Sequence, residues 1–249
     1  GDFARAVGGD ATRVTQILHP NTDPHDYEPR PKDIQATANA DVILVSGDAL
    51  DDWMGKVLEQ GGADVTPLDL GRKAPVKRAD DPHWWQDPRN AIIAVRELER
   101  ALHRKAPAYV ARLEQLDRDT AACIDKLPRS ARKLVTTHDS LGYYAARYGF
   151  DVIGAVIPSQ STEGQPSAGD VADLVDTIRA TGVKAVFAES SVDPKVEEAI
   201  ARETGATVGT PLWADTLGPE GSSGATYIDS IRANTRSIVD GLSGGTVTC

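Results

Sequence analysis

Short, continuous apolar runs alternate along the chain with segments in which apolar residues recur three or four positions apart. Residues 42–45 are a run of the first kind, residues 50–59 are a segment of the second kind, and we predict a further strand over residues 65–70. Continuous runs are typical of buried parallel strands, and the longer spacing is typical of amphipathic helices. With a strand over residues 13–18 and a helix over residues 31–40, the order of elements predicts an N-terminal α/β lobe.

The same alternation returns in the second half of the chain. We predict strands over residues 134–137, 152–157, 185–188 and 207–212, and helices over residues 141–148, 171–180, 194–203 and 227–242. Between the halves, residues 87–128 have a helical pattern that breaks at Pro107, because proline cannot continue a helix. At about 1.5 Å per residue, residues 107–127 would span roughly 30 Å, enough to reach from one lobe to another.

These patterns predict an α/β fold of two lobes, each a mainly parallel sheet flanked by helices, joined by a long linking helix. We place the N-terminal lobe at residues 1–88, the linking helical region at residues 89–128 and the C-terminal lobe at residues 129–249. In open α/β sheets a ligand binds beyond the carboxyl ends of the strands, so the candidate chemistry is expected there.

The formal charge is −10 at pH 7. Binding nucleic acid by neutralising phosphates needs basic patches, so this charge argues against a nucleic-acid partner, and it is compatible with a bound cation. No apolar run has the length that a membrane span requires. No signal peptide is present at Gly1, so the chain is either cytosolic or begins after processing.

Two cysteines, Cys123 and Cys249, leave two interpretations open. Their spacing fits no zinc knuckle. A disulfide between them would indicate an oxidising compartment, and two unrelated thiols fit the sequence equally well.

Three histidines stand at rigid points of the chain. His25 and His83 each end an Asp-Pro-His tripeptide, and His138 follows an apolar run that we predict to be a strand. Together with Asp215, which follows a later predicted strand, they supply three nitrogens and one oxygen, a set that commonly binds zinc tetrahedrally. Taken one at a time, each histidine fits a turn or capping role at least as well.

Other polar side chains have competing interpretations. Glu28 and Glu189 could orient imidazole rings by accepting their second N–H, or could lie at the surface or at helix caps. Asp139 fits the N-cap of the following helix better than metal binding, and it is a third candidate for supporting an imidazole. His19 and His103 are expected to be exposed and inert.

Aromatic residues and a serine surround the candidate ligands. Trp84 and Trp85 beside His83 could form an apolar lid or could anchor their loop. Ser140 lies near His138, but the chain has no Gly-x-Ser-x-Gly elbow, so a serine hydrolase carries little weight.

Five segments, taken together, resemble the metal-binding extracytoplasmic solute-binding proteins of zinc and manganese ABC transporters, the cluster A-I family. They are residues 23–29, 81–91, 137–149, 187–191 and 214–219. The resemblance covers nearly the whole chain in order. It implies two α/β lobes tied by a long, rigid helix, the helical-backbone arrangement of class III solute-binding proteins. It also implies a metal between the lobes, with His25, His83, His138 and Asp215 as ligands, and no enzymatic activity.

The third ligand position indicates the zinc type of this family, because manganese-type members tend to carry Glu where this chain has His138. A third imidazole makes the site softer and favours zinc. The resemblance therefore implies a periplasmic or lipid-anchored monomer that captures Zn²⁺ with high affinity, and we expect a disulfide bond in that compartment. The monomer would deliver the ion to a membrane ABC permease and could receive it from a periplasmic zinc chaperone. The alternatives are a manganese- or iron-binding member of the family and, from another class, a zinc-dependent hydrolase.

The chain departs from the family pattern in three places. Relatives carry an apolar strand before the segment that starts at Gly1, many zinc-type members carry a long His-rich loop before the position of Asp81, and the connection around residues 102–107 is short. We expect that the first strand and a His-rich loop belong to the protein and are absent from this sequence.

Overall fold

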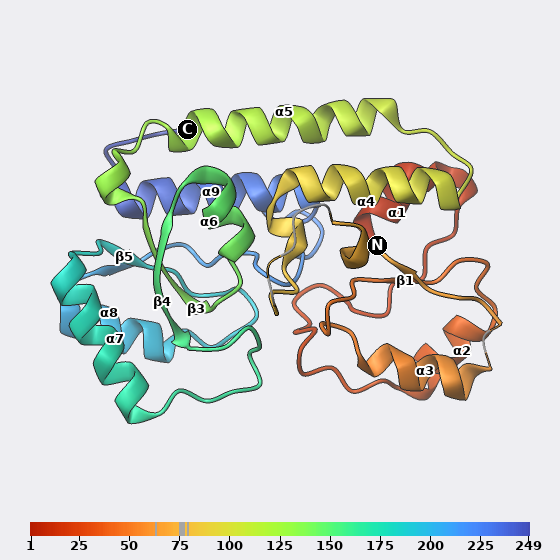
Figure 1. Ribbon diagram of the computed structural model, residues 1–249, viewed down its shortest axis with the longest axis horizontal. Helices are drawn as coiled ribbons and strands as arrows, with labels where there is room; N and C mark the ends of the chain where they lie inside the picture. The colour runs from red at the N-terminus through yellow and green to blue at the C-terminus, as the bar shows by residue number, and fades with distance from the viewer. Residues whose placement is uncertain (63, 75–77, 79) are drawn as a thin grey trace.

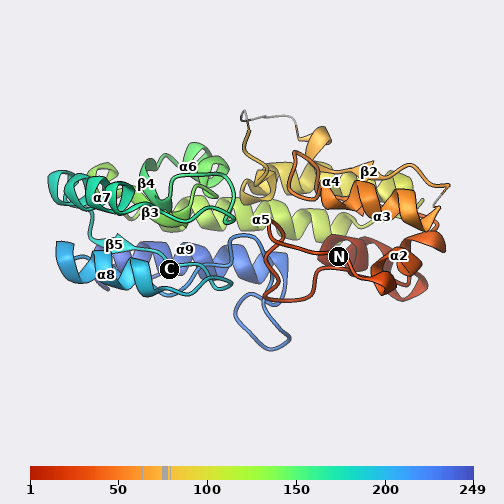
Figure 2. The same ribbon diagram turned by 90° about the horizontal axis from the view of Figure 1, so that it is seen from below.

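The computed structural model describes residues 1–62, 64–74, 78 and 80–249. Two lobes lie side by side along the long axis of the molecule, and a layer of long helices runs over both (Figures 1 and 2). This is the predicted α/β architecture of two lobes with small parallel sheets. The loop before Asp81, where the family pattern predicts a His-rich insertion, lies partly outside the described residues.

The N-terminal lobe is built from short elements. They are α1 (Asp2–Gly8), the 3₁₀ turn η1 (Gly9–Ala11), α2 (Pro31–Ala38), β1 (Leu44–Val45), α3 (Trp53–Gly61) and β2 (Leu68–Asp69), followed by the 3₁₀ turns η2 (Gly71–Lys73) and η3 (Trp84–Gln86). β1 and β2 pair in parallel, as predicted. The predicted strand over residues 13–18 is wrong, because the described chain places no strand beside this segment to bond its backbone.

The C-terminal lobe carries the longer strands. Its elements are η4 (Arg129–Ala131), β3 (Lys133–His138), α6 (Gly142–Tyr148), β4 (Asp151–Ile157), α7 (Ala168–Thr181), β5 (Ala185–Val186), α8 (Lys195–Thr204) and β6 (Thr207–Val208). β3 pairs in parallel with β4, and a bridge between Thr136 and Phe187 joins β3 to the segment of β5. Every paired strand is parallel, so the carboxyl ends of the strands meet on one side of the lobe, where His138 ends β3.

Three long helices bind the lobes together. α4 (Pro88–Ala101) and α9 (Tyr227–Ser243) both pack against α5 (Pro107–Ile124), which crosses above the two lobes (Figure 1). α4 and α5 each begin at a proline, which suits a first helical turn because its missing N–H needs no partner there. Leu98, Leu113 and Leu116 are fully buried between these helices, so the linking region is a packed layer and not an exposed linker.

Cys123, near the end of α5, forms a disulfide with Cys249 at the C-terminus. Their Cα atoms are 5.3 Å apart, within the usual range for a bridge. The open question left by the spacing is thus answered in favour of the disulfide, which ties the last residue of the C-terminal lobe to the helical layer. Among the described residues, no helix has the length and apolar character to cross a membrane.

Candidate metal centre

The structure brings all four predicted ligands together between the lobes. His25, His83, His138 and Asp215 each offer one ligand atom, and these atoms lie within 4.8 Å of one another. The Nε2 atom of His83 is 3.1 Å from that of His138 and 3.4 Å from that of His25. The carboxylate of Asp215 lies 3.3 Å from each of the three Nε2 atoms.

These separations fit a common metal centre. Four ligands bound tetrahedrally at about 2.0–2.1 Å from zinc lie about 3.3 Å from one another. The side chain of Asp215 is 1% exposed, and among the described residues neither of its oxygens has a hydrogen-bond partner. A buried carboxylate without a hydrogen-bond partner is costly, and a cation between the four groups would remove that cost. Their role as ligands stays a prediction.

Each Asp-Pro-His tripeptide folds into the same tight turn. In the first turn, Oδ1 of Asp23 accepts a hydrogen bond from the backbone N–H of His25 at 2.9 Å. In the second turn, Oδ1 of Asp81 accepts one from the backbone N–H of His83 at 3.0 Å. The aspartate mimics a backbone turn, and the proline fixes φ between the two residues. The repeated tripeptide therefore aims two imidazoles with little conformational freedom.

Carboxylates hold the rings of the two deepest histidines. The side chains of His83 and His138 are 0% exposed. Nδ1 of His83 lies 2.9 Å from Oδ1 of Asp81, and Nδ1 of His138 hydrogen-bonds Oε1 of Glu189. An acceptor on Nδ1 keeps a proton there, so in the neutral ring Nε2 carries the free lone pair that a metal needs.

Asp215 is held in place from both lobes through its neighbours. The carbonyl oxygen of Ala214 accepts hydrogen bonds from Nε1 of Trp85 at 3.0 Å and Nε2 of Gln86 at 2.8 Å. On the other side, Asn234 of α9 bonds both the N–H and the carbonyl of Trp213. The turn that follows His83 thus also fixes the loop that carries the carboxylate.

Burial and charge set the protonation of the site. Burial lowers the pKa of His138, but the Asp215 charge and the hydrogen bond to Glu189 outweigh it and raise the pKa to about 9. Burial raises the pKa of Asp215, but the three facing imidazoles overcome this and hold it well below its usual range. Burial also raises the pKa of Glu189. At neutral pH a proton on His138 therefore balances the Asp215 charge, and a metal ion has to displace it.

The other residues singled out in the sequence differ in whether they contact the site. Glu189 bonds an imidazole, whereas Glu28 is exposed. The predicted N-cap role of Asp139 is wrong: Leu141 occupies the N-cap of α6, and Oδ2 of Asp139 accepts a hydrogen bond from Nε2 of Gln160 at 2.7 Å. His19 and His103 are exposed, as predicted.

Trp84 and Trp85 anchor their loop. Trp84 is buried and its Nε1 donates to the carbonyl oxygen of Ser46 at 3.0 Å, while Trp85 donates to Ala214. Between the open alternatives of lid and anchor, the hydrogen bonds support the anchor.

Sequence reasoning missed Asp81 and Gln86 as parts of the site. Asp81 bonds both the backbone and the ring of His83, and Gln86 bonds the residue before Asp215. The repetition of Asp-Pro-His was a usable signal for Asp81, because a carboxylate two residues before a histidine can reach its N–H. No sequence signal pointed to Gln86, whose partner is 128 positions away.

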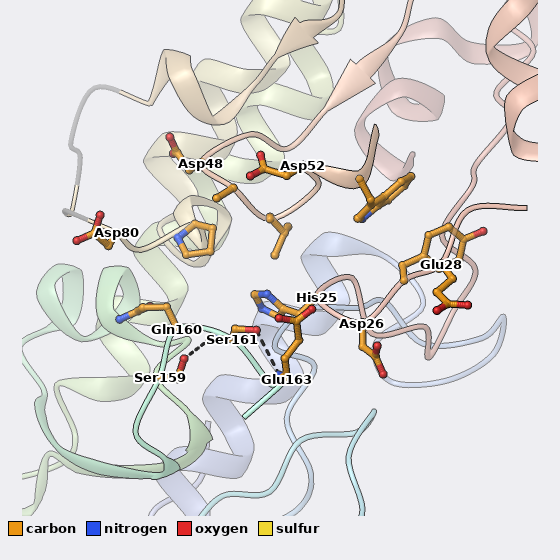
Figure 3. A pocket seen from close by; sticks show the side chains of 15 residues that line it. His25, Asp26, Glu28, Asp48, Asp52, Asp80, Ser159, Gln160, Ser161 and Glu163 are labelled. Carbon is orange, nitrogen blue, oxygen red and sulfur yellow. Dashed lines mark hydrogen bonds between the residues drawn. The ribbon is translucent and has the colours of Figure 1, made fainter. Parts of the chain in front are cut away.

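A pocket of about 550 Å³ opens beside the site, and His25 lies on its wall (Figure 3). Six acidic residues line it: Asp26, Glu28, Asp48, Asp52, Asp80 and Glu163. His25 is the most exposed of the three histidines, with 6% of its side chain accessible. Of the three histidines, His25 is therefore the one that borders this pocket.

The comparisons with known proteins agree with this geometry. A family described as "Zinc-uptake complex component A periplasmic" matches residues 1–241. The manganese-binding lipoprotein MntA of Halalkalibacterium halodurans is 30% identical over 98% of this chain and 85% of that protein. The iron-binding protein YfeA of Yersinia pestis is 31% identical over 97% of this chain and 83% of that protein.

A solved structure has the same fold. The periplasmic zinc-binding protein TroA from Treponema pallidum matches with a TM-score of 0.89 at 27% identity, covering 97% of this chain and 95% of that one. The fold is that of class III solute-binding proteins, as predicted, and the expected extracytoplasmic location and absence of enzymatic activity follow from the family. Such proteins bind a metal ion and hand it to a membrane permease. The chain belongs to the ZnuA family of periplasmic, metal-binding substrate-binding proteins of ABC transporters.

Proposed function

We propose that the protein captures Zn²⁺ in the periplasm, with His25, His83, His138 and Asp215 as its ligands, and delivers the ion to an ABC permease. The observation that carries this proposal is the third imidazole, His138, which stands fully buried where a harder ion would favour a carboxylate. Four protein ligands would close the coordination sphere, which suits capture and transfer better than catalysis with a bound water.

Manganese or iron is the second candidate, because two relatives are named for these metals. The orientation of the Asp215 carboxylate favours manganese or iron. The two oxygens of Asp215 face different histidines: Oδ1 lies 3.3 Å from His83, and Oδ2 lies 3.3 Å from His25 and from His138. A bidentate carboxylate would offer a fifth ligand atom, and higher coordination numbers suit manganese.

Two measurements test the proposal. Mass spectrometry of protein purified without added metal is expected to find one zinc per chain, and calorimetric competition is expected to show zinc displacing manganese. The variant His138→Ala should lose zinc binding, whereas His103→Ala, which removes an exposed histidine, should bind zinc like the wild type. Manganese or iron bound in preference to zinc would overturn the assignment of the metal.

Delivery requires the site to open. Because two ligands come from the N-terminal lobe and two from the C-terminal lobe, release needs relative movement of the loops that carry them. The docked permease is the agent we propose for that movement, and supply of zinc by a periplasmic chaperone and a monomeric state remain predictions.

A further inference from the structure

A loop of the C-terminal lobe reaches across to the N-terminal ligand. Residues 158–167 connect β4 to α7, and Ser159, Gln160, Ser161 and Glu163 of this loop line the pocket beside His25 (Figure 3). The base of the loop is fixed next to His138. The carbonyl oxygen of Ser159 accepts from the N–H of Asp139 at 3.0 Å, and Gln160 donates to the Asp139 carboxylate.

The tip of the loop contacts Asp23. Oγ1 of Thr162 donates a hydrogen bond to Oδ2 of Asp23 at 2.6 Å, across 139 positions of sequence. The other oxygen of the same carboxylate, Oδ1, accepts the N–H of His25 at 2.9 Å. One carboxylate therefore joins the C-terminal lobe to the backbone of a ligand of the N-terminal lobe.

His25 depends on this connection more than the other histidines do. His83 and His138 have carboxylates on their Nδ1 atoms, whereas in the described part of the chain no carboxylate accepts a hydrogen bond from Nδ1 of His25. Residues 12–30, which contain His25, form no helix or strand, so neighbouring turns of regular structure do not fix it. The backbone bond to Asp23 and a longer bond from Nε1 of Trp53 to the carbonyl oxygen of Pro24, at 3.3 Å, thus restrain the position of this imidazole.

We propose that Thr162 is a positioning residue: its hydrogen bond to Asp23 latches the two lobes at the metal site and holds His25 against the other three ligands. The inference rests on the proposed function, because it needs His25 to bind the ion. A hydroxyl bonded to a carboxylate at 2.6 Å is a short, charge-assisted contact. Breaking it frees Asp23 and then His25, the ligand nearest the pocket, so the latch controls how fast the metal leaves.

Zinc dissociation into an excess of a chromogenic chelator, followed by stopped flow, tests this role. Thr162→Val keeps the shape and removes the donor, and it should raise the dissociation rate constant about tenfold, the effect of one hydrogen bond to a charged group. The association rate should stay within about twofold of wild type, because steering by charge is unchanged. Thr162→Ser keeps the hydroxyl and should restore slow release.

Ser161→Ala is the matched control. Its hydroxyl accepts the N–H of Glu163 within the loop and makes no contact with Asp23 in the structure. A dissociation rate of Thr162→Val equal to that of wild type, or an equal acceleration by Ser161→Ala, would overturn the latch.

A double-mutant cycle separates the latch from general damage to the fold. In an Asp23→Ala background the acceptor is already gone, so adding Thr162→Val should leave the dissociation rate unchanged, and a further acceleration contradicts the proposal. Zinc uptake and release by the wild-type protein alone test the proposed function. A wild-type chain that takes up no zinc overturns both inferences, whereas slow release from both wild type and Thr162→Val overturns the latch alone.

Discussion

Replacing Asp81 with alanine removes the single oxygen that accepts both hydrogen bonds fixing His83. The carboxylate of Asp81 is buried, and its Oδ1 accepts the backbone N–H of His83 at 3.0 Å and lies 2.9 Å from Nδ1 of the ring. His83 is fully buried, so the freed Nδ1–H would find no water in its place. The ring can then turn, or move its proton to Nε2, the nitrogen that the metal needs.

The size of the effect follows from these contacts. Loss of an acceptor behind a metal-binding histidine typically weakens metal binding about 10–100-fold. Asp81→Ala loses two hydrogen bonds and leaves a buried donor unpaired, so we expect about 30–100-fold weaker zinc binding, or about 2–2.8 kcal/mol. Asp81→Asn keeps a carbonyl oxygen as acceptor and loses only the charge, so its loss should be smaller, about tenfold or less.

Competition with a chelator of known affinity measures these dissociation constants. Asp26→Asn is the matched control, because Asp26 is next to His25 in sequence and lines the pocket, but is exposed. It removes the same charge without touching an imidazole. An Asp81→Ala protein that binds zinc within about threefold of wild type would refute the orienting role, since the expected loss is at least tenfold. An equal loss in Asp26→Asn and Asp81→Asn would mean that charge, and not ring orientation, sets the affinity.

Three further outcomes are expected. Asp215→Ala removes the charged ligand and should weaken zinc binding more than about 100-fold; unchanged affinity by calorimetry would mean that the fourth ligand is misassigned. Because the pKa of His138 is raised to about 9 and zinc needs the neutral ring, affinity should rise as pH increases toward 9 and fall about tenfold per pH unit below it; a dissociation constant that is flat between pH 6 and 8 would contradict this. Reducing the Cys123–Cys249 bridge, which spans 126 positions, should lower the free energy of unfolding by up to about 5 kcal/mol. The Tm measured by calorimetry should fall by roughly 10–20 °C. The zinc affinity should change by no more than about twofold.

The sequence predicted the order of elements well because apolar spacing reports burial. It overextended several strands for the same reason. Residues 65–70 are partly buried, yet only Leu68–Asp69 form a strand there. In residues 207–212 the strand is limited to Thr207–Val208, and Leu212 adds one isolated bridge to Glu189. Burial of a run does not reveal whether a partner strand lies beside it, and residues 13–18 are the extreme case.

The candidate site was predictable where a residue type that binds metals stands at a rigid turn or at the end of a strand. Rigid turns and strand ends marked His25, His83 and His138. The roles of Glu189 and Asp139 could not be separated, because each depends on which side chain lies opposite in space. Thr162 carried no signal, since its partner Asp23 belongs to the other lobe.

The packing of the helical layer indicates how the site opens. α5 contacts both α4 and α9, and a buried cluster that includes Leu113, Leu116 and Ile231 joins these helices, so a wide swing of one lobe would expose apolar surface. By contrast, residues 12–30 and 158–167 meet through the bond between Asp23 and Thr162. Metal-free and zinc-bound crystal structures should therefore superpose within about 1 Å over the three helices and differ in these loops. A rigid-body rotation of one lobe between the two structures would show that the helical layer bends and that this reasoning is wrong.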